Sequence, residues 1–245
     1  MDSKWIQSIE RILYNWDDTV LSGRCMGGGE MATFIATLGF DSTRVTRPIL
    51  THGFDEQDEI ILIHPTDHDN PRAEEAKDDI RRMLVELQPN VEIRTVTLDP
   101  EAFFDSIRRT AAQVDAAEDN VVLILGGGAR DIYLPVAFVA FVRQSAIDTI
   151  LQFSDITGSV NELTIPGLLH PPGDSVVKTL EAIVDEDDGV SFSLIADSVG
   201  VSKSTVVRHI SELEEREFVR SEMDGKSKMV YPTEQACLAV DLDAL

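Results

Sequence analysis

The fold of the C-terminal part is decided by the stretch Ser191-Phe-Ser-Leu-Ile-Ala-Asp-Ser-Val-Gly-Val-Ser-Lys-Ser-Thr-Val-Val-Arg-His-Ile-Ser-Glu-Leu213. It indicates a helix, a tight turn at Gly200, and a second helix whose first backbone N–H groups the Ser202 hydroxyl can cap. Apolar residues recur in the second helix at i, i+4 and i+7, which indicates one buried stripe formed by Val206, Ile210 and Leu213. The stretch therefore predicts a helix-turn-helix.

The polar residues of the second helix favour DNA binding. A recognition helix presents donors to phosphates and base edges at its N-terminal end. We expect the DNA-binding residues here to be Ser202, Lys203, Ser204, Thr205, Arg208 and His209. The alternative is a small helical domain that serves only for packing or for protein contact.

A hairpin follows the second helix. Asp224-Gly225 separates two strand-like runs, and this dipeptide favours the tight turn of a β-hairpin. Lys226 and Lys228 alternate on the hairpin, where they are placed to reach backbone phosphates. With a further helix at residues 174–185, these elements predict a winged helix-turn-helix over residues 174–235, followed by a tail at residues 236–245.

The charge of the chain runs against the usual pattern of a nucleic-acid binder. Asp and Glu number 44 against 21 Lys and Arg, giving a net charge of −23, and only 6 of the cations are lysines. An acid-rich, lysine-poor composition resembles that of proteins from halophiles. In molar salt the Debye length is about 3 Å, so long-range repulsion from DNA is nearly abolished and local contacts decide binding.

The cysteines and the apolar runs of the sequence indicate the cellular compartment in which we expect the protein. Cys25 and Cys237 lie far apart, in no metal or redox motif, so we expect a reducing cytoplasm and no disulfide framework. No apolar run approaches the length of a membrane span, and we expect no membrane partner. The spacing of His64 and His68 would suit a metal mainly on a helix, which Pro65 argues against, so no metal site is predicted.

Upstream, strands alternate with helices. The pattern predicts strands at residues 31–38, 59–64, 91–98 and 120–125, separated by helices ending at residue 50 and spanning residues 71–87 and 100–114. A long apolar helix at residues 132–142 follows, and strands at 149–153 and 160–165 can pair as a hairpin. Near-continuous apolar strands with helical crossovers indicate an α/β fold, a Rossmann-like mostly parallel sheet with helices on both faces. We assign it to residues 31–166, followed by a linker at residues 167–173. Residues 1–30 are either an N-terminal extension or lie before a true start at Met31.

Two loops in this domain are candidates for binding an anion. Each follows a strand, contains glycine, supplies an arginine and ends at a helix N-terminus, where free N–H groups favour anions. We expect the ligand-binding residues to be Gly39, Phe40, Asp41, Ser42, Thr43, Arg44, Gly127, Gly128, Ala129 and Arg130. The alternative is that the glycines only turn the chain and that the arginines are solvated. The glycine spacing fits neither a dinucleotide fingerprint nor a Walker loop.

The Leu38-Gly-Phe-Asp41 segment, the Gly126-Gly-Gly-Ala-Arg130 segment, the terminal hairpin and the winged helix resemble those of the CRISPR-associated Rossmann-fold (CARF) transcriptional regulators. The resemblance implies a homodimer that binds a cyclic oligoadenylate, in particular cyclic tetra-adenylate, between its Rossmann-like domains, with no other cofactor. The ligand would then tune binding to double-stranded DNA near CRISPR genes. The alternative is a nucleotide-binding Rossmann-like enzyme with an accessory winged helix, either a ring nuclease that cleaves this ligand or another enzyme of this kind.

Overall fold

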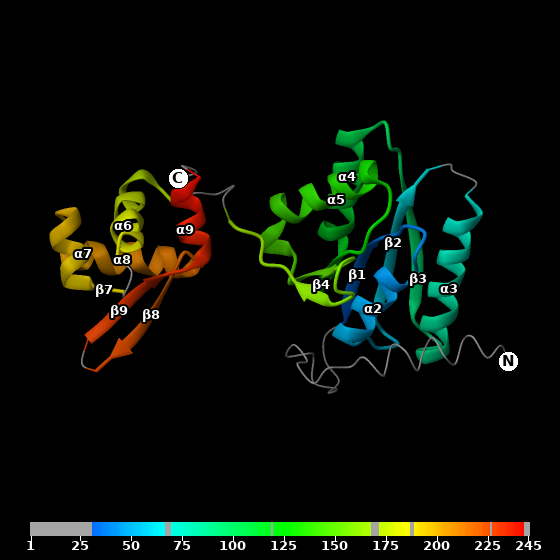
Figure 1. Cartoon of the computed structure of the whole chain (residues 1–245), viewed down its shortest axis with the longest axis horizontal. Helices are drawn as coiled ribbons and strands as arrows, with labels where there is room; N and C mark the ends of the chain where they lie inside the picture. The colour runs from blue at the N-terminus through cyan, green and yellow to red at the C-terminus, as the bar shows by residue number, and fades with distance from the viewer. Residues whose placement is uncertain are drawn as a thin grey trace. The chain divides into compact units, whose positions relative to one another are not determined.

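The computed structural model describes residues 31–66, 70–118, 120–167, 172–186, 189–225 and 227–242. The chain divides into two compact units, residues 1–165 and residues 166–245 (Figure 1). The division falls one residue before the linker expected at residues 167–173. The alternatives for residues 1–30 lie outside the described residues.

The first unit is built on a six-stranded sheet with the order β3-β2-β1-β4-β5-β6. The first five strands are parallel, and β6 pairs with β5 in the antiparallel sense, so the predicted terminal hairpin is confirmed. The strands are β1 (Ala32–Thr37), β2 (Glu59–Pro65), β3 (Glu92–Leu98), β4 (Asn120–Leu125), β5 (Thr149–Phe153) and β6 (Val160–Glu162).

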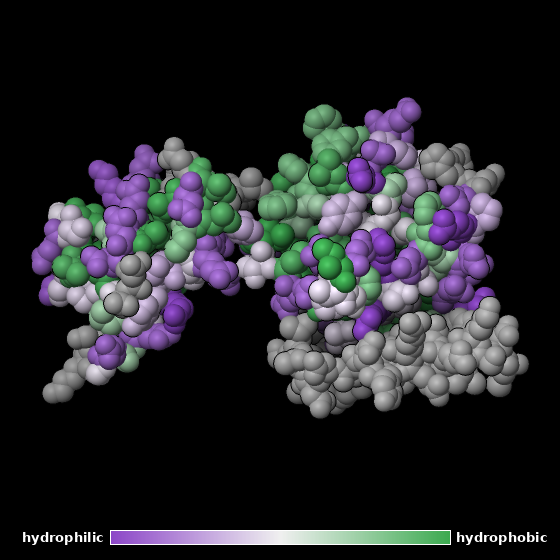
Figure 2. Space-filling view, in the orientation of Figure 1, coloured by the Kyte–Doolittle hydropathy of each residue, from purple (hydrophilic) through white to green (hydrophobic). Residues whose placement is uncertain are grey.

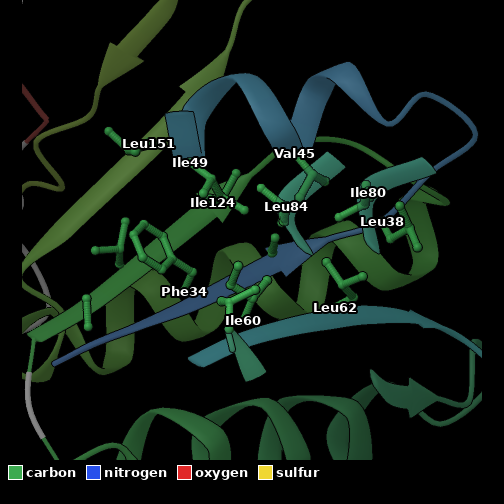
Figure 3. Packing of buried hydrophobic residues seen from close by; sticks show 14 of the residues in the cluster. Phe34, Leu38, Val45, Ile49, Ile60, Leu62, Ile80, Leu84, Ile124 and Leu151 are labelled. Carbon is green, nitrogen blue, oxygen red and sulfur yellow. The ribbon is translucent and has the colours of Figure 1, made fainter. Parts of the chain in front are cut away.

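Helices cover both faces of this sheet, because both faces of its central strands are apolar. On one face Phe34, Ile60 and Ile124 pack against α2 (Thr43–His52) and α3 (Pro71–Leu87) in a single core, shown in Figure 3. On the other face Ile35, Ile61 and Leu123 pack in a second core. The helices of that second core are α4 (Phe103–Ala116) and α5 (Arg130–Val142). The predicted Rossmann-like α/β fold is therefore confirmed.

An apolar patch lies on α5 and the first turn of α4. Figure 2 shows hydrophobic residues gathered over these two helices. Its most exposed members are Phe104, at 72% exposure, and Leu134, at 60%. Also exposed on the same pair of helices are Phe103, Phe138 and Phe141.

The second unit has a helical core and a small antiparallel sheet of order β7-β9-β8. The core joins all four helices through buried residues such as Leu180, Ile195, Ile210 and Ala236. Its elements are α6 (Asp174–Val184), β7 (Val190–Ser191), α7 (Phe192–Val199), α8 (Lys203–Glu215), β8 (Val219–Asp224), β9 (Ser227–Pro232) and α9 (Glu234–Asp241). The strands β8 and β9 form the predicted wing, pairing from Val219 with Pro232 to Asp224 with Ser227.

The end of the chain differs from the sequence expectation. Residues 236–245, expected as a tail, contain most of α9, which Thr233 caps by accepting a hydrogen bond from the Ala236 N–H at 3.4 Å. Ala236 and Ala239 are fully buried in the core of the second unit. The helix belongs to this unit because its small apolar face completes the packing around α6 and β9.

Candidate ligand pocket and DNA-binding face

The two candidate loops of the first unit lie side by side. Because β1 and β4 are neighbours in the sheet, the segment after β1 and the segment after β4 leave the same edge next to each other. Strand order reverses here, since β2 lies on one side of β1 and β4 on the other. In open α/β sheets this reversal is the usual place of a ligand crevice.

Glycine is required in these loops because their backbones touch. A Cβ atom on Gly39 would lie 2.9 Å from the Gly128 backbone nitrogen, and one on Gly128 would lie 2.8 Å from the Leu38 carbonyl oxygen. Gly128 also has a φ of +109°, which other residues rarely adopt. The Gly127 N–H donates to the Thr37 hydroxyl at 3.2 Å and joins the second loop to the end of β1. The glycines therefore hold the two loops together.

A cavity of about 680 Å³ opens beside these loops. Its volume lies within the usual range of ligand pockets. Its walls come from the ends of β1, β2 and β3, the start of α3 and the second glycine loop. The lining residues are Leu38, Gly39, Phe40, Asp41, Arg44, His64, Pro65, Asn70, Arg72, Ala73, Glu74, Thr97, Gly128 and Ala129.

Arg44 is the central cation of the cavity. Its Nη2 lies 3.1 Å from Asp155 Oδ1, in the turn between β5 and β6, and its Nε lies 3.6 Å from Asp41 Oδ2. The Nε atom is buried and has no hydrogen-bond partner among the described residues. The Arg44 side chain as a whole is 35% exposed and its two carboxylate neighbours are themselves exposed, so the guanidinium can exchange them for an anionic oxygen.

A second cation lies across the cavity on α3. The guanidinium carbon of Arg72 is 5.4 Å from the centroid of the Phe40 ring, which is 55% exposed. An exposed aromatic ring beside an arginine is a surface on which a nucleobase can stack. Asn70 caps α3 by accepting from the Arg72 N–H at 3.1 Å, so the positive end of the helix dipole lies at the cavity wall.

His64 lines the same cavity. Burial is the main cause that lowers the pKa of His64, followed by the nearby charge of Lys77, so the ring is neutral at neutral pH. Its Nδ1 lies 3.0 Å from the Pro65 carbonyl oxygen. Because a carbonyl only accepts, Nδ1 carries the proton and Nε2 is left as an acceptor. Asp67, His68 and Asp69 lie outside the described residues.

The structure brings together six of the ten predicted ligand residues around the cavity: Gly39, Phe40, Asp41, Arg44, Gly128 and Ala129. Ser42, Thr43, Gly127 and Arg130 do not line it, and Arg130 is exposed at the start of α5. The sequence interpretation missed the wall from the end of β2 and the start of α3. The same rule about the carboxyl ends of parallel strands applies there and could have found it.

In the second unit the predicted turn and cap are present. Gly200 adopts the left-handed conformation, with a φ of 74°, and lets the chain turn between α7 and α8. The Ser202 hydroxyl accepts from the Thr205 N–H at 3.2 Å and caps α8. Lys203, Ser204 and Arg208 are exposed on this helix, as predicted, while Thr205 is half-buried.

His209 lies on the opposite side of α8 from the one expected. It is 2% exposed, and its Nδ1 is 2.8 Å from the Thr179 hydroxyl oxygen of α6. The inward residues of α8 are Val206, His209, Ile210 and Leu213, a spacing of i, i+3, i+4 and i+7. His209 therefore belongs to the core, and its place on the predicted DNA-binding face is a correction.

The cations of this unit differ in their acidic neighbours. Lys228 Nζ of the wing lies 3.7 Å from Glu214 Oε1, and Arg220 is paired with Glu222. Lys203 and Arg208 form no ion pair with another described residue. The start of α8 is therefore where positive charge is free to meet a phosphate or a base. Lys226 lies outside the described residues.

Two kinds of feature are absent from the part of the chain that the structure describes. It holds no group of three or more His, Cys, Asp or Glu side chains placed to bind a metal ion. None of its helices is long and apolar enough to cross a membrane.

Comparison with known protein families agrees with this two-part architecture. Residues 32–155 match the Csa3 CRISPR-associated Rossmann-like domain. Residues 176–222 match the IclR helix-turn-helix domain. The two matches define the class: a CRISPR-associated Rossmann-like domain joined to a helix-turn-helix domain of the type found in transcriptional regulators. The chain belongs to the family of proteins that carry the Csa3 CRISPR-associated Rossmann-like domain.

Solved structures are similar to a smaller part of the chain. A MarR-family transcriptional regulator from Rhodococcus sp. RHA1 is 27% identical over 30% of this chain and 52% of its own, with a TM-score of 0.28. Staphylococcus aureus MepR in a DNA complex is 19% identical over 29% of this chain and 60% of its own, with a TM-score of 0.28. AF1382 from Archaeoglobus fulgidus is 23% identical over 30% of this chain and 85% of its own, with a TM-score of 0.28. The chain thus spans about half the length of the first of these regulators. No curated protein matched the chain in a sequence comparison.

Proposed function

We propose that this protein is a DNA-binding transcriptional regulator of CRISPR-associated genes that senses a cyclic oligoadenylate, namely cyclic tetra-adenylate. The observation that carries the proposal is the cavity that the β1 and β4 loops share, in a chain of this family that also carries a helix-turn-helix. The chemistry of the cavity suits such a ligand. Arg44 offers a partly exposed guanidinium to a phosphate, and the exposed Phe40 ring offers a stacking surface to an adenine.

The proposal includes a homodimer formed by the first unit. The apolar surface of α4 and α5 supports it, because exposed apolar patches of this kind mark protein interfaces. A two-fold axis would bring two copies of Arg44 to one cyclic ligand. Each copy would then bind equivalent phosphates of a ring that is itself symmetric. Leu134→Asp is expected to give monomers in sedimentation experiments.

Calorimetry with cyclic tetra-adenylate tests ligand binding. We expect one ligand for two chains, and a melting temperature that rises with ligand concentration, because the ligand binds only the folded dimer. Linear tetra-adenylate is the control for phosphate charge without ring closure. Absence of both heat and thermal shift with any cyclic oligoadenylate would contradict the sensor proposal and leave the first unit as a dimerisation domain.

A second candidate function is cleavage of the same ligand, and His64 is the observation that favours it. A neutral imidazole in the cavity, whose Nε2 is an acceptor, can take the proton from a ribose 2′-hydroxyl. The 2′-oxygen would then attack the adjacent phosphorus, and the 5′-oxygen would leave with a proton, giving a 2′,3′-cyclic phosphate end. Chromatography of the ligand after incubation separates the two functions, since a regulator returns intact rings. A linear product that His64→Gln abolishes would establish the enzyme.

A further inference from the structure

The inward position of His209 changes which residues α8 offers to DNA. With Val206, His209, Ile210 and Leu213 turned inward, the residues on the outer face are Ser204, Val207, Arg208 and Ser211, again spaced i, i+3, i+4 and i+7. Val207 lies in the middle of this row and is 52% exposed. An exposed apolar residue therefore directly precedes Arg208, which forms no ion pair with another described residue, one turn after the capped start of the helix.

The neighbours of Val207 are short. Ser204 precedes it by one turn, and its hydroxyl lies 2.9 Å from that of the capping Ser202. Ser211 follows it by one turn and donates its hydroxyl proton to the Val207 carbonyl oxygen at 3.1 Å. Both hydroxyls are thus already engaged with the helix itself. Short side chains on each side let the helix approach a surface closely enough for the valine methyl groups to touch it.

The charges of α8 limit the contact to its first half. Lys203 and Arg208 lie there, whereas the later turns carry exposed Glu215, together with Glu212, which pairs with Arg216 at 3.6 Å. Phosphates would be attracted to the first half of the helix and repelled by the second. Val207 is therefore in the part that would enter a major groove, where the thymine C5-methyl is the apolar feature to be recognised.

We propose that Val207 determines specificity by contacting a thymine methyl group in the major groove, next to a base contacted by Arg208. The proposal rests on the proposed DNA-binding function and adds the base feature that is recognised. The proposed contact is with the methyl group and not with the hydrogen-bonding edge of thymine, because the valine side chain has no donor or acceptor.

Uracil substitution tests this contact, because it removes the methyl group and leaves base pairing unchanged. A duplex consensus is first selected from a random-sequence pool with the full-length protein. Each thymine is then replaced by uracil in turn, and affinity is measured at constant salt. We expect one thymine per half-site whose replacement weakens binding about fourfold, the factor expected for loss of one buried methyl-sized group.

Variants of Val207 should change that factor. Val207→Ser is expected to bind thymine and uracil duplexes equally, whereas Val207→Thr, which keeps one methyl group, should retain part of the preference. Serine, threonine and valine have similar helix propensities, so the fold should be preserved. Val85→Ser, at a valine 38% exposed on α3 of the other unit, is the matched control and should keep the full preference.

Failure of the Val207 contact and failure of the proposed DNA-binding function give different results. A selected consensus that is insensitive to uracil at every position, or a preference that survives in Val207→Ser, overturns the role of Val207 while DNA binding stands. A pool that yields no consensus overturns both.

Discussion

Arg44 Nη2 lies 3.1 Å from Asp155 Oδ1, so the turn between β5 and β6 holds the arginine that faces the cavity. An anionic ligand that binds Arg44 must compete with this carboxylate. The side chains are 35% and 61% exposed, and ion pairs at such positions contribute little, so the competition is weak. The pair therefore does not prevent Arg44 from binding a ligand.

Removing the competitor should strengthen ligand binding. We expect Asp155→Asn to raise the affinity for cyclic tetra-adenylate by up to about fivefold, since exposed ion pairs contribute about 0.2–1 kcal/mol. Arg44→Ala should weaken the same affinity strongly, because a charge-assisted hydrogen bond to phosphate is lost. Calorimetry on both variants checks this. Weaker binding by Asp155→Asn would show instead that Asp155 orients Arg44 for the ligand.

The packing of the two glycine loops predicts a difference between two glycines. Gly128→Ala should lower the free energy of unfolding by more than about 1 kcal/mol, the usual size of the effect at a strained backbone position. It should also disturb ligand binding. Gly53 also has a positive φ, of +86°, but a Cβ there meets nothing within 4 Å. Gly53→Ala is therefore the control for backbone strain alone. Equal denaturant midpoints for the two variants would mean that the contact with the Leu38 carbonyl is not needed.

The burial of His209 makes the second unit sensitive to pH. Burial is the main cause that lowers the pKa of His209 from its ordinary value of 6.5, followed by the charge of Arg208. The unfolded chain therefore binds a proton at a higher pH than the folded chain does. The resulting stability is complete above about pH 6.5 and is lost as the pH falls towards the lower folded pKa.

Melting curves of the wild type and His209→Leu measure this effect. The wild type should lose stability as the pH falls from about 6.5 towards the lower folded pKa, and this component should be missing from the variant. Thr179→Val should lower the free energy of unfolding by about 1–3 kcal/mol at neutral pH, because a buried imidazole nitrogen loses its partner. Identical pH profiles for the wild type and His209→Leu would contradict the assignment.

The unpaired cations at the start of α8 should dominate DNA affinity. Lys203→Ala is expected to weaken binding to all sequences and to reduce the slope of log affinity against log salt by about 0.9, as for one lost phosphate contact. Arg208→Ala should weaken binding mainly to the selected sequence, by about 1–3 kcal/mol, if it reads a base. Arg143→Ala, at an arginine paired with Asp115 in the other unit, is the control. An Arg143→Ala effect equal to that of Arg208→Ala would argue against the recognition-helix assignment.

The sequence predicted the two folds well because each depends on a regular apolar pattern. The loops after β1 and β4 could be assigned to the same edge of the sheet because parallel strands put their carboxyl ends at one edge. The helical spacing of Val206, Ile210 and Leu213 already allows a fourth inward residue at 209. Because histidine is polar, His209 was instead predicted to lie on the exposed face of the helix. Its partner Thr179 lies 30 positions away on another helix, which no local pattern reveals.

The cavity was predicted only in part for a similar reason. The loops after β1 and β4 could be recognised by their glycines and arginines. The wall residues His64, Pro65, Asn70 and Arg72 include no glycine to mark them. The pairing of Arg44 with Asp155 depends on how the β5–β6 turn folds against α2, a tertiary contact without a sequence motif.

We propose centrally that a ligand in the first unit controls DNA binding by the second. The most direct test is to measure the affinity for the selected duplex with and without cyclic tetra-adenylate. We predict that the ligand changes the Kd of the wild type by at least about fivefold, which is within the usual range of coupling between sites. The Kd of Arg44→Ala should not change. An unchanged Kd in a protein that calorimetry shows to be saturated with the ligand would contradict this proposal.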